Sequence, residues 1–308
     1  MTGERPHPAR KYRAPIRFHT RPRAQPTPKL LAHVERVYEH QDADTARFRR
    51  AAPSLLARLT PDMSMLTAMT CDHRFAFLFE NWAASCDRHG IDVRSTTLVV
   101  PTDIEAHRRV ESLGFVSWFD TDSDALSMME ASGRYGDNHW VEYMYHQNWV
   151  VQQLLALPGR PDVLFQDVDL VWRHDPRPDL AARAADGVDV QAMYDGPAPR
   201  FQPLYANTGF MCLRNTATTR MFWDVVCAHH DMVGFYRSQQ EPLNVILAIH
   251  AQQDLSVEIL DDERFANGFR YCGPRTPPDD PWVVHHSWTA DLDEKLDRYR
   301  SNGHWYLG

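Results

Sequence analysis

The stretch DVLFQDVDLVWRHDP, residues 162–176, carries the strongest structural signal in the chain. Its segment Val163-Leu-Phe165 is apolar without alternation, which is typical of a strand that is buried on both faces of a sheet. Asp167 and Asp169 follow at a spacing of two, so in an extended chain both carboxylates face one side while Val168 faces the core. The stretch therefore predicts a central strand that ends in a pair of acids.

The two acids are candidate metal ligands. Two carboxylates on one face repel each other unless a cation lies between them, and a carboxylate-rich site suits a hard divalent ion such as Mn²⁺ or Mg²⁺. Ligands of open α/β sheets bind beyond the carboxyl ends of the strands, where this pair falls. Five D-x-D triplets occur in the chain, but only the one at Asp167 follows a buried strand. The alternative is an exposed strand end with solvated acids.

Strands and helices alternate on both sides of this stretch. Strands are predicted at Met63–Thr70, Thr96–Val100, 191–194, Ala206–Leu213 and 257–260. Helices are predicted at 75–90, Ile104–Leu113, His139–Leu157, Thr216–His229 and Gln240–Ile249. Such alternation is typical of an α/β fold in which helices cover a mostly parallel sheet. We expect one domain over residues 61–308.

The N-terminal part of the chain differs in charge and composition. Residues 1–50 hold twelve Lys or Arg against five Asp or Glu, whereas residues 51–308 hold twenty-one against thirty-six. Residues 1–28 contain six prolines and no apolar periodicity, which predicts a flexible basic arm. Residues 29–60 space apolar side chains by three and four, which predicts a pair of helices interrupted at Pro53.

Composition excludes several classes of function. The body is acidic and would repel a phosphate backbone, so we expect no nucleic-acid partner. No run of eighteen apolar residues and no apolar signal segment is present, so we expect a cytoplasmic protein without a membrane span. The five cysteines form no CxxC pair, which argues against a zinc ribbon or disulfide framework. Only three of the thirty-three basic residues are Lys, which suggests a GC-rich bacterial genome.

Several segments resemble one known family. Val163–Pro176 resembles the "vlfsDvDvvWlrdP" signature of the nucleotide-diphospho-sugar transferases, which include plant cell-wall xylosyl-, galactosyl- and arabinosyltransferases. Asn207–Phe210 is similar to the family's "NaGf" strand, and Gln240–Asn244 to its "DQxxfN" segment. Val284–Trp288 with Lys295 resembles "vHxNw…K". The resemblance spans roughly residues 63–300.

The resemblance implies a GT-A-like fold and a metal-dependent, retaining transfer from a UDP-sugar, with Mn²⁺ as the usual ion. By position, it assigns the metal to Asp167, Asp169 and His285, and the donor to Thr70, Asp103, Asp167, Asn207 and Lys295. Neutral imidazole can complete a carboxylate metal site, although His285 also fits a buried core histidine. His286 would face the other way on a continuing strand.

The chain departs from the family pattern at Gln239, where the family has Asp, and at Ser287, where it has Asn. The helix segment Tyr145–Asn148 has no Lys, which family members often carry there. The resemblance places Gln240 near the reacting face of the sugar, and an amide is a poor nucleophile. We therefore expect the acceptor to attack from the leaving-group side, with Asp195 and Glu241 orienting sugar hydroxyls.

Two other functions remain open on the sequence. A nucleotide-sugar pyrophosphorylase or hydrolase would use the same acids, but it predicts a Gly-rich basic loop after the first strand, and Met69–Arg74 contains no Gly. A non-catalytic sugar- or nucleotide-binding module derived from a transferase would explain Gln239. The acceptor, whether glycan, peptide or small metabolite, is not defined, although Trp288 and Trp305 offer rings on which an acceptor could stack.

Overall fold

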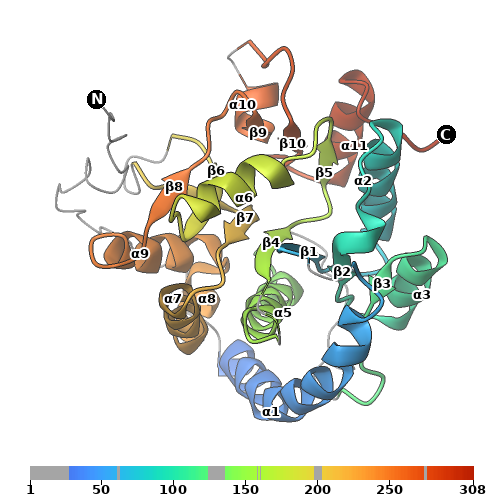
Figure 1. The fold of residues 1–308 in the computed structure, drawn as a ribbon. Coiled ribbons are helices and arrows are strands. Elements are labelled where there is room, and N and C mark those ends of the chain that lie inside the picture. The colour runs from blue at the N-terminus through green and yellow to red at the C-terminus, as the bar shows by residue number, and fades with distance from the viewer. Residues whose placement is uncertain are drawn as a thin grey trace.

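The computed structural model describes residues 28–60, 63–123, 136–157, 159, 161–197, 203–273 and 276–308. Among these residues, seven strands form the main sheet, in the order β3-β2-β1-β4-β7-β6-β8 (Figure 1). The strands are β1 Met65–Met69, β2 Thr97–Val99, β3 Val116–Ser117, β4 Asp162–Gln166, β6 Val190–Tyr194, β7 Ala206–Leu213 and β8 Val257–Ile259. Only β7 runs antiparallel to its two neighbours. The expected α/β fold with a mostly parallel sheet is thereby confirmed.

A second, three-stranded sheet lies beside the end of β4. It contains β5 Leu170–Trp172, β10 Val283–His285 and β9 Phe265–Asn267, with β10 in the centre. β10 pairs antiparallel with β5 and places His285 opposite Leu170. The chain therefore leaves the main sheet at Gln166 and enters the second sheet at Leu170. The acids predicted after the central strand lie in the connection between the two sheets.

Helices cover both faces of the main sheet. Figure 1 shows α1, α5, α7, α8 and α9 along one face, and α2, α6, α10 and α11 with the second sheet toward the other. The helices are α1 Pro28–Leu56, α2 Ala76–Arg88, α3 Ile104–Ser112, α5 Asn138–Leu155, α6 Arg177–Ala185, α7 Ala217–Ala228, α8 His230–Tyr236, α9 Gln240–His250, α10 Gly268–Cys272 and α11 Leu292–Ser301, with a short 3-10 helix at Arg94–Thr96. None of the described helices has both the length and the apolar character needed to cross a bilayer.

The core consists of two layers separated by the sheet. Val163 and Phe165 of β4 belong to the layer packed against α5, α7 and α9, whereas Leu164 belongs to the layer on the opposite face. All three side chains are fully buried. Both faces of β4 are therefore covered, which explains why its sequence is apolar without alternation, as predicted.

Helix α1 corrects one expectation. The helix pair predicted to break at Pro53 is a single helix, Pro28–Leu56, that contains Pro53. The proline stands only one turn before the helix end, and Ala52 and Leu55 around it are buried in the core, so packing holds this last turn in place. Phe48 lies against Trp118 and Trp149, with ring centroids 4.9 and 6.0 Å away. Residues 1–27 of the predicted basic arm lie outside the described residues.

Candidate active site

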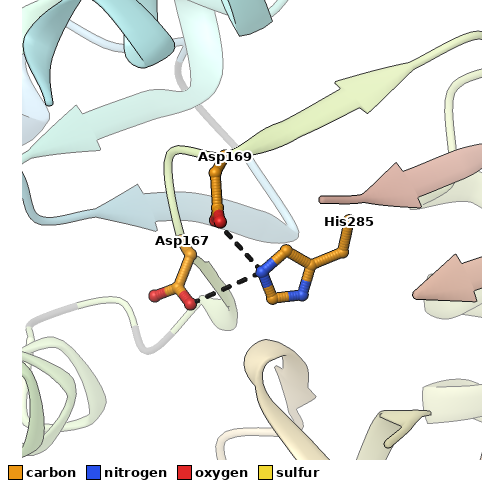
Figure 2. Close-up of side chains that lie close together, drawn as sticks. All are labelled: Asp167, Asp169 and His285. Atoms are coloured by element: carbon orange, nitrogen blue, oxygen red, sulfur yellow. Dashed lines mark hydrogen bonds and ion pairs between the residues drawn. The ribbon is translucent and has the colours of Figure 1, made fainter. Parts of the chain in front are cut away.

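Asp167, Asp169 and His285 lie together where the two sheets meet (Figure 2). The His285 Nε2 atom lies 3.0 Å from Asp169 Oδ1 and 3.7 Å from Asp167 Oδ2. One potential ligand atom from each residue lies within 4.8 Å of the other two. Backbone hydrogen bonds fix the acids, since the Asp167 amide donates to the Gly209 carbonyl and the Asp169 carbonyl accepts from the His286 amide, both at 2.9 Å. We call these three residues the acid-histidine triad.

Gly209 of β7 has no side chain, and two residues of the triad occupy the space where one would lie. A Cβ atom at this position would lie 2.5 Å from His285 Cε1 and 2.9 Å from Asp167 Cγ, and would overlap Asp167 Oδ2. Such distances are well inside van der Waals contact, so two side chains of the triad pack directly on the glycine backbone. A glycine inside a strand often marks such a close approach. Here the approach is made by the proposed metal ligands.

Asn207 determines which nitrogen of His285 faces the acids. The Asn207 Oδ1 atom accepts from the Gly209 amide at 2.9 Å and lies 3.1 Å from His285 Nδ1, while its Nδ2 donates to Asp195. The amide oxygen therefore faces His285, and Nδ1 carries the proton that it accepts. Nε2 is left toward the carboxylates. This is the support that metal-binding histidines receive from a neighbouring acceptor.

The charged groups of the cluster shift one another's pKa values. Burial and the neighbouring Asp169 raise the pKa of Asp167 above its ordinary value. Burial would also raise the pKa of Asp169, but Lys295 and His285 outweigh it and hold that pKa well below the ordinary value. Burial disfavours a charged His285, yet the two acids raise its pKa overall. Lys295 of α11 forms an ion pair with Asp169 Oδ2. Lys295, together with the imidazole of His285, thus lies against the acids where a metal ion would offset their charge.

Two buried glutamines hold Asp167 from the opposite side. Gln147 of α5 donates from Nε2 to Asp167 Oδ1 at 3.0 Å, and Gln239 donates from Nε2 to Gln147 Oε1 at 2.7 Å. Both side chains are buried. We call this pair the amide relay. Because Gln147 occupies Oδ1, Asp167 presents Oδ2 to the triad. Sequence reasoning noted only that this helix lacks Lys and missed the role of Gln147.

A second polar cluster surrounds Asp195, which follows β6. Asn207 Nδ2 donates to Asp195 Oδ1 at 2.5 Å, and Gln240 Nε2 donates to Oδ2 at 2.6 Å. The indole of Trp288 also donates to Oδ1, at 3.3 Å. Burial raises the pKa of Asp195, while these hydrogen bonds oppose the rise. The structure thus brings Asp195, Asn207 and Gln240 together, with Glu241 buried beside Gln240 in the first turn of α9.

Thr70 and Asp103 lie at the same edge of the sheet, because β1, β2 and β4 are parallel neighbours. Thr70 is buried, and its hydroxyl donates to the Tyr143 hydroxyl at 2.8 Å. The Asp103 carboxylate accepts from the Ala106 amide at 2.8 Å and from the His73 amide at 2.7 Å, so it caps α3. The first of these bonds is an ordinary helix cap, whereas the second joins the loop after β1 to the start of α3.

His286 lies on the side of β10 opposite His285. Its ring stacks on Tyr299 with centroids 3.8 Å apart, and its Nε2 lies 3.0 Å from Nδ1 of His304. The side chain is fully buried. The alternation predicted for the two neighbouring histidines therefore places His285 at the acids and His286 in the core.

Comparison with known proteins assigns the chain to a family. Residues 93–299, about two thirds of the chain, match the family model described as nucleotide-diphospho-sugar transferase. Similar solved structures include galactosyltransferase LgtC with donor and acceptor sugar analogs, at 14% identity and TM-score 0.49, over 79% of this chain and 97% of that chain. Another is glycosyltransferase GlyE of Streptococcus pneumoniae TIGR4, at 14% identity and TM-score 0.43, over 79% and 65%. No curated protein matches significantly. The matched segment contains the acid-histidine triad, the amide relay and Lys295, and the chain belongs to the nucleotide-diphospho-sugar transferase family of glycosyltransferases.

Proposed function

We propose that the chain transfers a sugar from a UDP-sugar to an acceptor hydroxyl, with retention and with a divalent cation held by the acid-histidine triad. The observation that carries the proposal is the triad itself, because Nε2 of His285 is turned toward two carboxylates by Asn207. The mixed nitrogen and oxygen donors fit Mn²⁺ better than Mg²⁺, which prefers oxygen alone. Asp167, Asp169 and His285 would hold the ion, which would supply positive charge to the leaving diphosphate.

The remaining side chains do the positioning. Lys295, which pairs with Asp169, would add its charge at a phosphate of the donor. Asp195, which is buried, and Gln240, which is partly buried, form a polar wall one hydrogen bond beyond Asn207, suited to the hydroxyls of the donor sugar. We propose that Thr70 and Asp103 contact the nucleotide, because they lie at the same edge of the sheet as the triad. Glu241 is proposed to contact hydroxyls of the sugar.

The hydrogen bonds around Asp195 favour retention by attack from the leaving-group side. Double displacement needs a free nucleophile on the opposite face of the sugar. Both Asp195 oxygens accept hydrogen bonds, and the Gln240 amide is a weak nucleophile that is already bound to Asp195. The acceptor hydroxyl would then attack beside the departing diphosphate, whose oxygen can take the proton.

We also propose that residues 61–308 form the catalytic domain and that residues 29–60 are a helical extension on it. Phe48 anchors the extension between Trp118 and Trp149, and the Trp149 indole donates to Thr45 at 2.9 Å. The extension packs on the sheet face that carries α5. The basic arm lacks a core-forming sequence pattern, so removal of residues 1–28 should leave donor turnover unchanged.

The proposed function is tested by incubating the purified chain with a panel of nucleotide-sugars, with Mn²⁺ or with EDTA. A transferase releases free UDP from a UDP-sugar in the presence of Mn²⁺ and not in EDTA. A hydrolase acting on the phosphates would release UMP, and a pyrophosphorylase would form UTP when pyrophosphate is added. A binding module would give no product, and UDP would raise its melting temperature equally with and without Mn²⁺. Any of these three results would contradict the proposal.

A further inference from the structure

Trp288 is an exposed aromatic residue in a strained backbone conformation at the rim of the site. Its side chain is 50% exposed, although it stands three residues after the buried His285. Its φ angle of 59° lies in the left-handed region, which is rare for a bulky residue. Surrounding structure must therefore force this conformation, and strain of this kind is concentrated at ligand-binding positions.

Close backbone contacts hold Trp288 in place. A Cβ atom on Gly268 would overlap the carbonyl oxygen of Ser287, so the residue before Trp288 is packed directly on the start of α10. A Cβ on Gly196 would lie 3.3 Å from Trp288 Cζ2, and the Phe269 ring lies 5.4 Å from the indole centroid. The indole is thus supported by Gly196 and Phe269 while half of its surface faces solvent.

Hydrogen bonds connect this indole to the acid-histidine triad. The Trp288 Nε1 atom donates to Asp195 Oδ1 at 3.3 Å, and the same oxygen accepts from Asn207, whose Oδ1 lies 3.1 Å from His285 Nδ1. The exposed ring is therefore the outer edge of the polar cluster around Asp195. A group that enters this cluster from solvent passes the exposed indole surface.

We propose that Trp288 is the stacking platform of the acceptor and that the acceptor is a carbohydrate. A pyranose ring has one apolar face of C–H bonds and a rim of hydroxyls, so it can pack flat on an indole while a hydroxyl points to the neighbouring polar groups. A small anionic acceptor would be repelled by the neighbouring Asp195 carboxylate, whereas the neutral hydroxyls of a sugar can donate hydrogen bonds to it. The inference rests on the proposed transferase function and names the substrate class of the same site.

The direct test is nuclear magnetic resonance of the tryptophan indole N–H groups, with the Trp288 signal assigned from Trp288→Phe. Methyl glycosides of glucose, galactose, mannose and xylose are titrated into the full chain with Mn²⁺ and UDP. At least one should shift the Trp288 signal saturably, with half-saturation of about 1 mM or above for a ligand of roughly a dozen heavy atoms. The signals of the fully buried Trp82, Trp172 and Trp223 should not move.

Kinetics with the best glycoside gives the second measurement. Trp288→Asn removes the ring but suits a left-handed φ, and should raise the acceptor KM about three- to tenfold, more than it raises the donor KM. Trp282→Phe, a partly buried tryptophan whose ring lies 6.3 Å from that of Phe265, is the matched control and should keep the wild-type acceptor KM. A Trp288 signal that stays fixed with every glycoside, or a donor KM that rises more than the acceptor KM, overturns the inference. Failure of the proposed function is recognised separately, because the protein would then release no free UDP from a UDP-sugar in the presence of Mn²⁺.

Discussion

Replacing Gly209 with alanine should displace the side chains that form the candidate metal site. The new Cβ would lie 2.5 Å from His285 Cε1, whereas ordinary contact begins at 3.4 Å, so a displacement of about 1 Å is required. His285 is 3% exposed and can yield only together with the surrounding backbone, whereas Asp167 lies at the more open side of the cluster, with a side chain that is 31% exposed and can turn away. We therefore expect Asp167 to move and its hydrogen bond to Gln147 to break.

The expected loss follows from that displacement. Loss of correct ligand placement costs about 10–100-fold in metal affinity, and a misplacement of about 1 Å can cost about 100-fold in rate. The Mn²⁺ concentration for half-maximal rate should therefore rise about 10–100-fold in Gly209→Ala. The backbone at position 209 does not have a positive φ, so alanine itself adds no backbone strain there.

The assay is the initial rate of UDP release against Mn²⁺ concentration, together with thermal unfolding of the metal-free protein. Cys212→Ala is the matched control, because it alters the same strand in the buried layer that contains Leu164 and should cost stability without changing the Mn²⁺ requirement. A Gly209→Ala protein that is folded and has the wild-type Mn²⁺ requirement would refute the placement of the ion at the triad.

Three further predictions concern the surroundings of the site. Gln147→Leu should weaken Mn²⁺ binding by about tenfold because Asp167 loses the amide relay, whereas Gln152→Leu on the same helix should not, as measured by calorimetry. His285→Ala should raise the Mn²⁺ requirement about 10–100-fold and His286→Ala less, and wild-type affinity should fall from pH 8 to pH 6, because the pKa of His285 is raised and its proton competes with the ion. Burial lowers the pKa of His146 to about 4, so between pH 6.5 and 4 the unfolded chain binds one more proton than the folded chain. His146 should therefore lower the free energy of unfolding by about 3 kcal/mol as the pH falls to 4. Urea unfolding of His146→Gln at pH 7 and pH 4 should show a correspondingly smaller loss than the wild type; an equal loss would exclude His146 as a cause.

The meeting of Asp167, Asp169 and His285 could be predicted from sequence only in part. The apolar run Val163–Phe165 marks the strand that the acids follow, and His285 is the last residue of β10. The two acids lie in the bent connection between the sheets, so strand alternation does not set their directions. The family resemblance added the order of these segments along the chain. The biochemical roles of the three residues remain the subject of the experiments above.

Other features depended on tertiary packing and left no pattern in the sequence. Gln147 contacts Asp167 across twenty residues from within an otherwise ordinary helix, so its residue type alone does not indicate the amide relay. Pro53 signalled a break that the buried Ala52 and Leu55 override. Asp103 follows a strand as a ligand-binding residue would, but its carboxylate caps α3. For Gln147 the deciding contact comes from a residue twenty positions away, whereas Asp103 contacts Ala106 within its own helix.

The central claim is that the acid-histidine triad holds a divalent cation that nucleotide binding requires, and UDP calorimetry with Mn²⁺ or EDTA tests it most directly. The wild type should bind UDP at least about 100-fold more tightly with Mn²⁺, and Asp169→Asn should lose most of that gain while remaining folded. Asp293→Asn, an exposed acid of another D-x-D triplet, is the matched control and should behave as the wild type. Equal UDP affinity of the wild type in Mn²⁺ and EDTA, or an undiminished gain in Asp169→Asn, would contradict the account.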